Sequence, residues 1–378
     1  MSSALSNSEL LRYSRQLLLP EVSLAGQAKL KNASVLLIGA GGLGSPALLY
    51  LAAAGIGRIG IAEFDRVDRS NLQRQILYSD SDVGAPKIER ALTRLRALNP
   101  EIELSPHELR VQADNVIDLI SAYDLIIDGS DNFATRYLIN DACVLSKKTL
   151  VHGAIYRFEG QVTVLGFKGG PCYRCLFPEA PSADAVPNCA EAGVLGVIAG
   201  IIGSVQASEA LKVILEIGQI LSGKLLLCDA LSMRFDTLSF SKNVDCAVCG
   251  SNPKIKTLED LIVSCKSEEK TANMKIIAPR ELDAELKSGR NLLLLDVRNH
   301  EEVALCRLPQ STHIPLPELP ARFKELDPSA EIVVYCKSGG RSMRAMQFLE
   351  SQGFQKTRNL TGGILGWAHE VDPSLPTY

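Results

Sequence analysis

The stretch Gly39-Ala40-Gly41-Gly42-Leu43-Gly44 decides how the front of this chain folds. It follows a short apolar run, residues 35–38, and leads into an alanine- and leucine-rich segment, residues 47–54. That order is typical of a strand, a tight turn and the start of a helix, where free backbone N–H groups bind phosphate oxygens. The spacing of Gly39, Gly41 and Gly44 also fits the dinucleotide fingerprint. This stretch alone therefore predicts a nucleotide site for ATP or for NAD.

The residues after this stretch extend the same pattern. A second apolar run, residues 59–62, ends at Glu63, which lies at the spacing expected for an acid that binds a ribose hydroxyl. Apolar runs then alternate with helical patterns through residues 33–150. The alternation predicts an α/β fold with a doubly wound, largely parallel nucleotide-binding sheet and helices on both faces.

Polar clusters follow the predicted strands, where ligands bind in such sheets. After the second strand comes Ser70-Asn71-Leu72-Gln73-Arg74, Lys87 opens a later helix, and Asp131 and Asn132 follow the run at residues 125–127. Each charge taken alone is compatible with an ordinary solvent-facing loop. Two cations and several carboxylates near a glycine-rich loop suit a triphosphate with Mg²⁺ better than a nicotinamide ring. The clusters together favour ATP.

Composition sets the broad class of the protein. The chain has 378 residues, 46% hydrophobic and 22% charged, with a net charge of −3. That length allows two or three domains, and the even balance of charge argues against direct nucleic-acid binding. The Ser-rich N-terminus lacks the pattern of a secretory signal. No apolar run approaches the roughly 20 residues of a membrane span, and we expect the stretch Gly193–Val205 to be a buried core helix. These features predict a cytoplasmic protein without a membrane segment.

Four of the ten cysteines form two C-x-x-C pairs, Cys172 with Cys175 and Cys246 with Cys249. Each pair can direct two thiolates to one point, and two pairs complete a tetrahedral site with no open position. In a cytosolic chain such pairs are more often metal ligands than disulfides. A redox role is the alternative, but neither pair lies in a thioredoxin-like context. The spacing favours a structural zinc site.

Cys189 lies in a proline-interrupted loop, residues 178–192, just before a predicted helix. A helix N-terminus favours the thiolate form, and a thiol here could reach the nucleotide site. The residues alone are equally compatible with an unreactive loop thiol.

The composition changes beyond residue 250. We expect a first domain over 1–250, a polar linker over 251–276 and a small α/β domain over 277–378. In the last domain the apolar run 332–335 leads directly into Cys336-Lys337-Ser338-Gly339-Gly340-Arg341 and a helix. Inward-facing N–H groups, the helix dipole, Lys337 and Arg341 all favour an anionic sulfur or a bound anion at Cys336. This pattern predicts a reactive cysteine.

These motifs together resemble a known fusion of two families. Residues 9–250 resemble the MoeB/ThiF family of sulfur-carrier adenylyltransferases, relatives of the ubiquitin-activating enzymes, and residues 277–378 resemble a rhodanese domain. The first match rests on Arg12-Tyr-Ser-Arg15-Gln, the Gly39–Gly44 loop, residues 70–75, Pro86-Lys87, Asp131-Asn132, both C-x-x-C pairs and Cys189-Ala-Glu-Ala-Gly193. The second rests on Asp296-Val-Arg298, the Cys336–Arg341 loop and residues 362–367.

The resemblance implies a role for each matching residue. The glycine loop, with Gly39, Gly41, Gly42 and Gly44, holds the phosphates and Glu63 the ribose. Residues Ser70, Asn71, Leu72, Gln73, Arg74 and Lys87 surround the triphosphate, while Asp131 holds Mg²⁺ with Asn132 beside it. Arg15 reaches into the partner subunit's site, which implies a homodimer. Cys189 forms a thioester or acyl-disulfide with the carrier, and Cys336 carries the persulfide.

The resemblance also implies the reaction and the partners. The expected substrate is a small ubiquitin-like sulfur carrier ending in Gly-Gly, adenylated with ATP and then converted to a thiocarboxylate. The carrier could serve molybdopterin, thiamin, cysteine or transfer-RNA thiolation, and the sulfur donor could be a cysteine desulfurase or thiosulfate. Two departures from the family pattern are Glu63, where the family usually has aspartate, and the stretch 306–315, which lacks the usual glycine-rich lead-in. Two other functions fit parts of the chain: an NAD-dependent oxidoreductase, and a non-catalytic scaffold for a ubiquitin-like protein.

Overall fold

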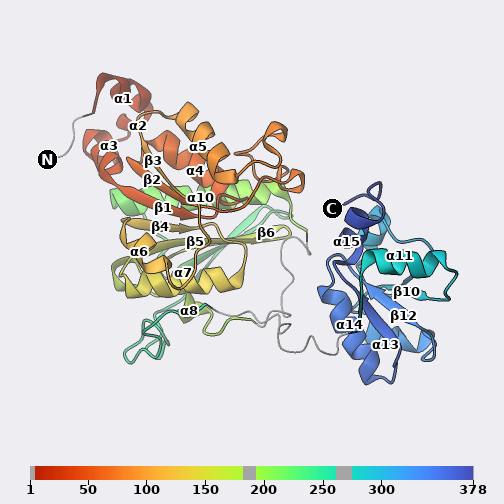
Figure 1. Cartoon of the computed structure of the whole chain (residues 1–378). Coiled ribbons are helices and arrows are strands. Elements are labelled where there is room, and N and C mark those ends of the chain that lie inside the picture. Colours follow the sequence, from red (N-terminus) through yellow and green to blue (C-terminus); the bar gives the residue numbers. More distant parts are fainter. Residues whose placement is uncertain (1–4, 182–192, 261–274, 378) are drawn as a thin grey trace. The chain divides into compact units, whose positions relative to one another are not determined.

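The computed structural model describes residues 5–181, 193–260 and 275–377 (Figure 1). The chain forms two compact units, Met1–Cys265 and Lys266–Tyr378. Each unit is described by itself below. Cys189 and most of the predicted linker, residues 261–274, lie outside the described residues.

The first unit is built on an eight-stranded sheet with the order β3-β2-β1-β4-β5-β6-β7-β8. The strands are β1 (Ser34–Ile38), β2 (Arg58–Ala62), β3 (Glu103–His107), β4 (Leu125–Asp128), β5 (Thr149–Tyr156), β6 (Glu159–Leu165), β7 (Lys224–Asp229) and β8 (Arg234–Ser239). The first five in chain order pair in parallel, and β6, β7 and β8 are antiparallel. The sheet is thus mixed, because tight hairpins rather than crossover helices connect β5 to β6 and β7 to β8.

Helices cover both faces of this sheet (Figure 1). One face carries α3 (Ser23–Asn32), α4 (Gly44–Ala54), α5 (Lys87–Leu98) and α10 (Gly196–Leu215), and the other carries α6 (Val116–Ser121), α7 (Phe133–Leu145) and α8 (Tyr173–Leu176). The side chains of β1 alternate between the two cores: Val35 and Leu37 pack on the first face, Leu36 and Ile38 on the second. This explains why residues 35–38 are a continuous apolar run. Short helices α1 (Asn7–Arg12) and α2 (Ser14–Leu17) precede the sheet.

Within the described ranges, α10 is the one helix long and apolar enough to cross a membrane. Its contacts are those of a core helix, since it packs against α4, β5 and β6. Two buried polar side chains on it bond inside the unit: Gln206 donates to the Asp128 carbonyl at 2.7 Å, and Glu209 accepts from the Leu221 N–H at 2.9 Å. The helix therefore occupies the core position expected for the stretch beginning at Gly193.

The second unit is a five-stranded parallel sheet with the order β11-β10-β12-β13-β9. Its strands are β9 (Ile276–Ile277), β10 (Leu293–Asp296), β11 (Thr312–His313), β12 (Ile332–Tyr335) and β13 (Thr357–Leu360). The helices are α11 (Pro279–Lys287), α12 (His300–Leu305), α13 (Leu319–Arg322), α14 (Gly340–Ser351) and α15 (Gly363–Glu370). Apolar clusters on both faces of the sheet form the core.

Candidate functional site

The glycine loop connects β1 to the start of α4. Gly39 has φ of 90°, and a Cβ there would lie 2.9 Å from the Gly129 carbonyl oxygen. A Cβ on Gly44 would lie 2.1 Å from the Gly39 oxygen, so no larger side chain fits either position. At Gly41 and Gly42 an added Cβ would meet nothing closer than 3.4 Å. Gly39 and Gly44 thus shape the turn, whereas Gly41 and Gly42 leave backbone accessible, as a phosphate loop requires.

The predicted triphosphate residues lie beside this loop. The Arg74 side chain is 3.5 Å from the Cβ position of Gly42, and its guanidinium donates to Ser70 O at 3.2 Å and Asn71 Oδ1 at 3.3 Å. Gln73 packs its backbone against Gly196, where a Cβ would come within 2.0 Å. Leu72 is half-buried against the first core. The segment 70–74 is therefore held against both the loop and the start of α10.

Lys87 begins α5 and is buried. Its Nζ lies 3.1 Å from Asp65 Oδ2, and that carboxylate is half-exposed. The ion pair holds the Lys87 ammonium group just beyond the end of β2. There the ammonium group can exchange its contact with Asp65 for a contact with an arriving phosphate.

Glu63, at the end of β2, is buried directly behind the glycine loop. Oε2 accepts the Ala40 N–H at 3.0 Å, and Oε1 accepts the N–H groups of Phe64 at 2.8 Å and Asp65 at 2.9 Å. The extra methylene of glutamate lets the carboxylate fold back onto these donors. The structure thus places Glu63 at the loop, with its oxygens bonded to backbone; the ribose contact stays a prediction.

The loop after β4 meets the glycine loop through Gly129. Asp128 is fully buried, and its Oδ1 accepts from the Ser130 N–H at 2.9 Å and Ser130 Oγ at 2.6 Å. Asp131 is exposed, and Asn132 caps α7 by accepting the Thr135 N–H at 2.9 Å. The cap fixes the backbone beside Asp131, the predicted Mg²⁺ ligand.

Asp128 is the centre of a buried polar group. Its Oδ2 lies 2.9 Å from His152 Nδ1 and 3.9 Å from Arg136 Nε. Burial raises the pKa of the Asp128 carboxyl, but the His152 hydrogen bond and the nearby positive charge outweigh it, so the net pKa is lowered. Burial lowers the pKa of His152. A neutral imidazole therefore donates its Nδ1–H to an ionised carboxylate.

Arg15 lies on α2 and is exposed. The predicted function of Arg15 needs a second subunit, and its exposure leaves it accessible to one. Cys189, the predicted carrier-binding thiol, lies outside the described residues.

The structure brings the two C-x-x-C pairs together. All four sulfurs lie within 4.8 Å of one another, with Cys172–Cys175, Cys172–Cys246 and Cys175–Cys249 separations of 3.9, 3.6 and 3.4 Å. A tetrahedral zinc with Zn–S distances of about 2.3 Å places its sulfurs about 3.8 Å apart. Among the described residues, this is the one group of His, Cys, Asp and Glu side chains that could hold a metal ion.

The chemistry of the four thiols also suits a cation. Hydrogen bonding between the sulfurs lowers the pKa of Cys175 to about 4 and raises that of Cys172. Burial, with the neighbouring sulfur of Cys175, raises the pKa of Cys249 to about 12. Without added positive charge the group therefore holds a single thiolate readily. A bound metal ion removes this restriction, because it compensates all four negative charges. The residues present fit zinc.

In the second unit, Cys336 lies at the end of β12 and is buried. Its Sγ accepts from the Gly339 N–H at 3.1 Å and from Ser342 Oγ at 3.3 Å. Gly339 has φ of 106°, which favours glycine and turns its N–H inward. Close packing of Gly363 against the Cys336 carbonyl, where a Cβ would lie at 2.4 Å, holds the loop from behind. The Gly339 N–H and the Ser342 hydroxyl thus form a donor ring around the sulfur at the N-terminus of α14.

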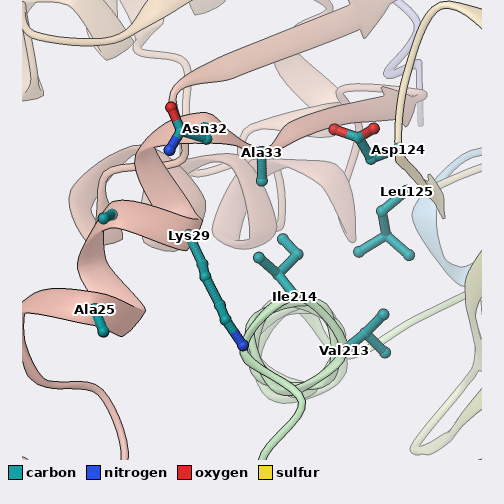
Figure 2. Close-up of a pocket in the computed structure, with 9 residues that line it drawn as sticks. Ala25, Lys29, Asn32, Ala33, Asp124, Leu125, Val213 and Ile214 are labelled. Carbon is teal, nitrogen blue, oxygen red and sulfur yellow. The ribbon is translucent and has the colours of Figure 1, made fainter. Parts of the chain in front are cut away.

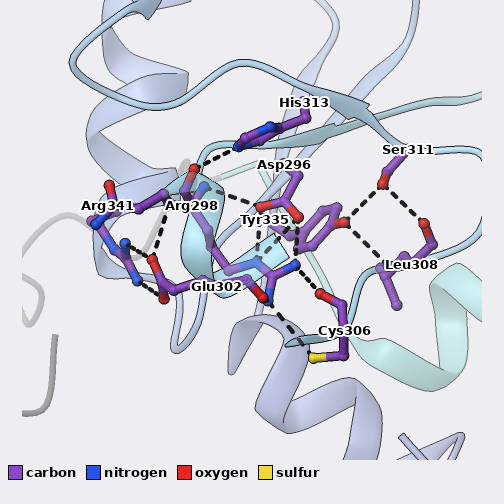
Figure 3. Close-up of polar contacts among 10 residues, drawn as sticks. Asp296, Arg298, Glu302, Cys306, Leu308, Ser311, His313, Tyr335 and Arg341 are labelled. Atoms are coloured by element: carbon purple, nitrogen blue, oxygen red, sulfur yellow. Dashed lines mark hydrogen bonds and ion pairs between the residues drawn. The ribbon is translucent and has the colours of Figure 1, made fainter. Parts of the chain in front are cut away.

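The Arg341 side chain forms an ion pair, so its guanidinium does not serve anion binding alone (Figure 3). Its guanidinium makes two bonds to the Glu302 carboxylate, at 2.5 and 2.7 Å, and both side chains are largely buried. Glu302 also accepts the Asn299 N–H at 3.0 Å, closing the N-terminus of α12. Arg341 therefore ties the Cys336 loop to α12, and its charge is shared with a carboxylate.

A second buried ion pair lies beside the pair of Arg341 and Glu302 (Figure 3). Arg298 and Asp296 are fully buried, and the guanidinium donates from Nε and Nη2 to the two carboxylate oxygens, at 2.9 and 2.6 Å. Arg298 also donates to the Cys306 carbonyl at 2.7 Å, and its own carbonyl accepts from His313 Nε2 at 2.7 Å. The segment 306–315, which departs from the expected family pattern, is thus anchored to the sheet through Cys306 and His313 by Arg298.

A surface pocket lies elsewhere in the first unit (Figure 2). It is lined by α3 and α10 residues such as Lys29 and Ile214 and by Asp124 before β4. Asp124 is already bonded to the Ser34 N–H and hydroxyl, at 2.8 and 2.7 Å, and the pocket is at the opposite strand ends from the glycine loop. It takes no part in the sites above.

Sequence reasoning missed several residues that shape these sites: His152, Arg136, Tyr173, Glu302 and Ser342. His152 lies inside β5 and Arg136 inside α7, where a lone polar residue gives no local signal. The one available signal was a charged or polar residue at an apolar position of such a segment. Ser342 follows the Cys336 loop directly, and its place in the first turn of a helix could have suggested it.

Comparison with known proteins gives matches to both units. The model of the ThiF family matches residues 13–248, and that of the rhodanese-like domain matches residues 278–370. The probable adenylyltransferase/sulfurtransferase MoeZ of Mycobacterium tuberculosis is 45% identical over 100% of this chain and 97% of its own. The adenylyltransferase and sulfurtransferase MOCS3 of Aedes aegypti is 42% identical over 99% of this chain and 90% of its own.

Solved structures resemble the first unit in fold. The crystal structure of E. coli MccB with MccA-N7isoASN aligns with a TM-score of 0.58 and 23% identity, over 65% of this chain and 76% of its own. A structure of E. coli MccB with ATP aligns with a TM-score of 0.56 and 23% identity, over 63% of this chain and 74% of its own.

Proposed function

Because the chain belongs to the ThiF family and also carries a rhodanese-like domain, we propose that it is an adenylyltransferase and sulfurtransferase acting on a ubiquitin-like sulfur carrier. The observation that carries the proposal is the MoeZ match, which spans both units at 45% identity. The product is a carrier thiocarboxylate, and molybdenum-cofactor biosynthesis is the pathway that these relatives favour. Neither an NAD-dependent oxidoreductase nor an idle scaffold is supported by the full-length matches.

In the first reaction the C-terminal carboxylate of the carrier attacks the α-phosphorus of ATP, and the bond to the β-phosphate oxygen breaks. The products are a carrier acyl-adenylate and pyrophosphate. Gly41 and Gly42 offer backbone N–H groups to the phosphates, while Arg74 and Lys87 balance the charge that develops there. We assign Asp131 to the Mg²⁺ ion, whose chemistry is to neutralise the phosphates. Most of the catalytic effect comes from positioning.

In the second reaction the terminal sulfur of a Cys336 persulfide attacks the acyl carbon and displaces AMP, giving an acyl-disulfide. A second thiolate, which we assign to Cys189, attacks the Cys336 sulfur and releases the thiocarboxylate. The protein disulfide is then reduced by an external thiol. The Gly339 N–H and the Ser342 hydroxyl supply hydrogen-bond donors to the Cys336 sulfur during the first of these steps, the attack by the persulfide. A cysteine desulfurase or thiosulfate supplies the persulfide sulfur.

The proposal includes a structural zinc at the four cysteines and a cytoplasmic location, since free thiols persist as metal ligands in a reducing compartment. It also includes a homodimer, because the resemblance places Arg15 in the partner subunit's site and its side chain is exposed. Subunit mixing tests the homodimer. Arg15→Ala and Lys87→Ala chains, each inactive alone, should regain pyrophosphate exchange when mixed, to about one working site per dimer. No recovery in verified mixed dimers would contradict the action of Arg15 across the interface.

The decisive experiment is ATP–pyrophosphate exchange with purified Gly-Gly-tailed carriers. We expect one carrier to give exchange that depends on Mg²⁺ and falls at least about a hundredfold in Lys87→Ala, because a charged contact to a transferring phosphate contributes several kcal/mol. Exposed Lys147→Ala is the matched control and should keep full exchange. Failure of every carrier to form an AMP adduct would overturn the proposal.

A further inference from the structure

The four-cysteine group and the nucleotide loop are connected by a short chain of buried side chains. Tyr173 lies between the ligands Cys172 and Cys175 and is buried. Its ring packs edge-on against the His152 ring, with centroids 4.9 Å apart, and the Arg136 guanidinium lies near enough to oppose the rise in the pKa of the Tyr173 hydroxyl that burial causes. One residue of the cysteine turn therefore contacts two polar residues of the sheet and of α7.

Both of these contacts lead to the same carboxylate. His152 Nδ1 lies 2.9 Å from Asp128 Oδ2, and Arg136 Nε lies 3.9 Å from the same oxygen. The other oxygen, Asp128 Oδ1, holds the Ser130 N–H and hydroxyl at 2.9 and 2.6 Å. Ser130 is followed directly by Asp131, the residue assigned to Mg²⁺. Tyr173 thus reaches the nucleotide loop through two parallel routes.

A role in core stability alone does not account for this arrangement. His152 Nε2 and Arg136 Nε are buried and have no hydrogen-bond partner. A buried unsatisfied polar atom costs about 1–3 kcal/mol, and apolar residues in a strand and a helix would avoid that cost. What the polar residues provide is a fixed direction for the Asp128 carboxylate, and through it a fixed position for Ser130.

We propose that Tyr173, His152 and Arg136 are positioning residues that couple the four-cysteine site to nucleotide binding. The inference rests on the proposed function, because it needs ATP to bind at the glycine loop. A filled cysteine site fixes Tyr173, which fixes the pair around Asp128 and so the loop that receives Mg-ATP. Coupling between two sites is reciprocal. Bound nucleotide should therefore also retain the metal more strongly at the cysteines.

The test uses full-length protein with zinc bound and two readouts other than turnover. The first is the dissociation constant for a non-hydrolysable Mg-ATP analogue, and the second is the rate of zinc release to a chelator with and without that analogue. Tyr173→Phe removes the hydroxyl that responds to the Arg136 charge. Tyr137→Phe is the matched control, since its hydroxyl donates instead to the Phe177 and Glu179 carbonyls at 3.0 and 2.7 Å.

In wild-type protein and in Tyr137→Phe, the analogue should slow zinc release about fivefold. In Tyr173→Phe this effect should fall below about twofold, and the analogue should bind about fivefold more weakly. His152→Asn is a second variant: it keeps a donor within reach of Asp128 but removes the ring that Tyr173 contacts. It should lose the coupling while zinc content stays at one per chain.

The outcomes separate this inference from the proposed function. Wild-type protein that binds no nucleotide overturns both. Wild-type protein that binds nucleotide, with equal affinity and equal zinc release in Tyr173→Phe and His152→Asn, overturns the coupling and leaves the proposed function standing.

Discussion

The two units hold cysteine sulfur in opposite ways. In the first unit, four cysteine sulfurs lie within 4.8 Å of one another, so each sulfur has other sulfurs as neighbours. In the second, the single sulfur of Cys336 is surrounded by a backbone N–H and a hydroxyl, at 3.1 and 3.3 Å. The first arrangement needs a cation to compensate several thiolates. The second stabilises one negative charge with dipoles alone.

Under the proposed function, this difference separates sulfurs that serve structure from a sulfur that takes part in the reaction. A tetrahedral site with four protein ligands has no open position, so its thiolates cannot attack a substrate. Hydrogen-bond donors stabilise an anionic sulfur without forming a coordinate bond to it, so a sulfur lone pair stays available to attack a substrate. Cysteine sulfur would therefore serve two different functions in this chain, and the groups around each sulfur decide which function it has.

The largest expected effect is at the reactive sulfur. Cys336→Ala should reduce sulfur transfer to the carrier by more than about a thousandfold, because it removes the sulfur that we assign to the persulfide, while the adenylation exchange stays within about twofold of wild type. Persulfide content by mass spectrometry and pyrophosphate exchange measure the two activities. Loss of both together would show that the units do not act separately, and the comparison would fail.

The next effect is at the structural sulfurs. Cys172→Ser should lower zinc content to near zero and lower the unfolding midpoint of the first unit by at least about 10 °C, at roughly 2–4 °C per kcal/mol for a unit of this size. Metal analysis and calorimetry measure both. Cys143→Ser, a buried thiol outside the group, should retain the metal. Unchanged metal content in Cys172→Ser would refute the zinc assignment.

The smallest effect tests the donors around Cys336. Ser342→Ala removes the hydroxyl 3.3 Å from the sulfur, and a hydrogen bond to a charged group contributes about 1.5–3 kcal/mol. We expect sulfur transfer to slow about tenfold with no change in adenylation. Exposed Ser338→Ala in the same loop is the control and should behave as wild type. Equal rates in both variants would mean that the hydroxyl is not part of the donor ring.

What the sequence predicted well was local in the chain. The glycine loop, the two C-x-x-C pairs and the Cys336 loop each have their defining residues within about six positions, so spacing alone exposes the chemistry. The parallel part of the sheet followed from alternating apolar runs. That the two cysteine pairs meet in space also followed, because two half-sites imply one complete tetrahedral site.

What the sequence left open depends on contacts between distant residues. The direction of β6, β7 and β8 depends on hairpin geometry, which an apolar run does not encode. Glu302 pairs with Arg341 across 39 positions, and Glu63 accepts from Ala40 across 23. Neither pairing has a local signature, so the sequence indicated neither the Glu302 partner of Arg341 nor the backbone donors to Glu63, whose ribose contact stays a prediction. The hydrogen-bond partners of these two side chains become visible only in the three-dimensional structure.

The two cysteine pairs are 74 positions apart, and α10 with the strands β7 and β8 lies between them. During synthesis the second pair leaves the ribosome only after this whole region. Under the proposed zinc assignment, metal loading is therefore a late event in the biogenesis of the first unit, and a chain truncated before Cys249 would be released without the ligand that completes the site.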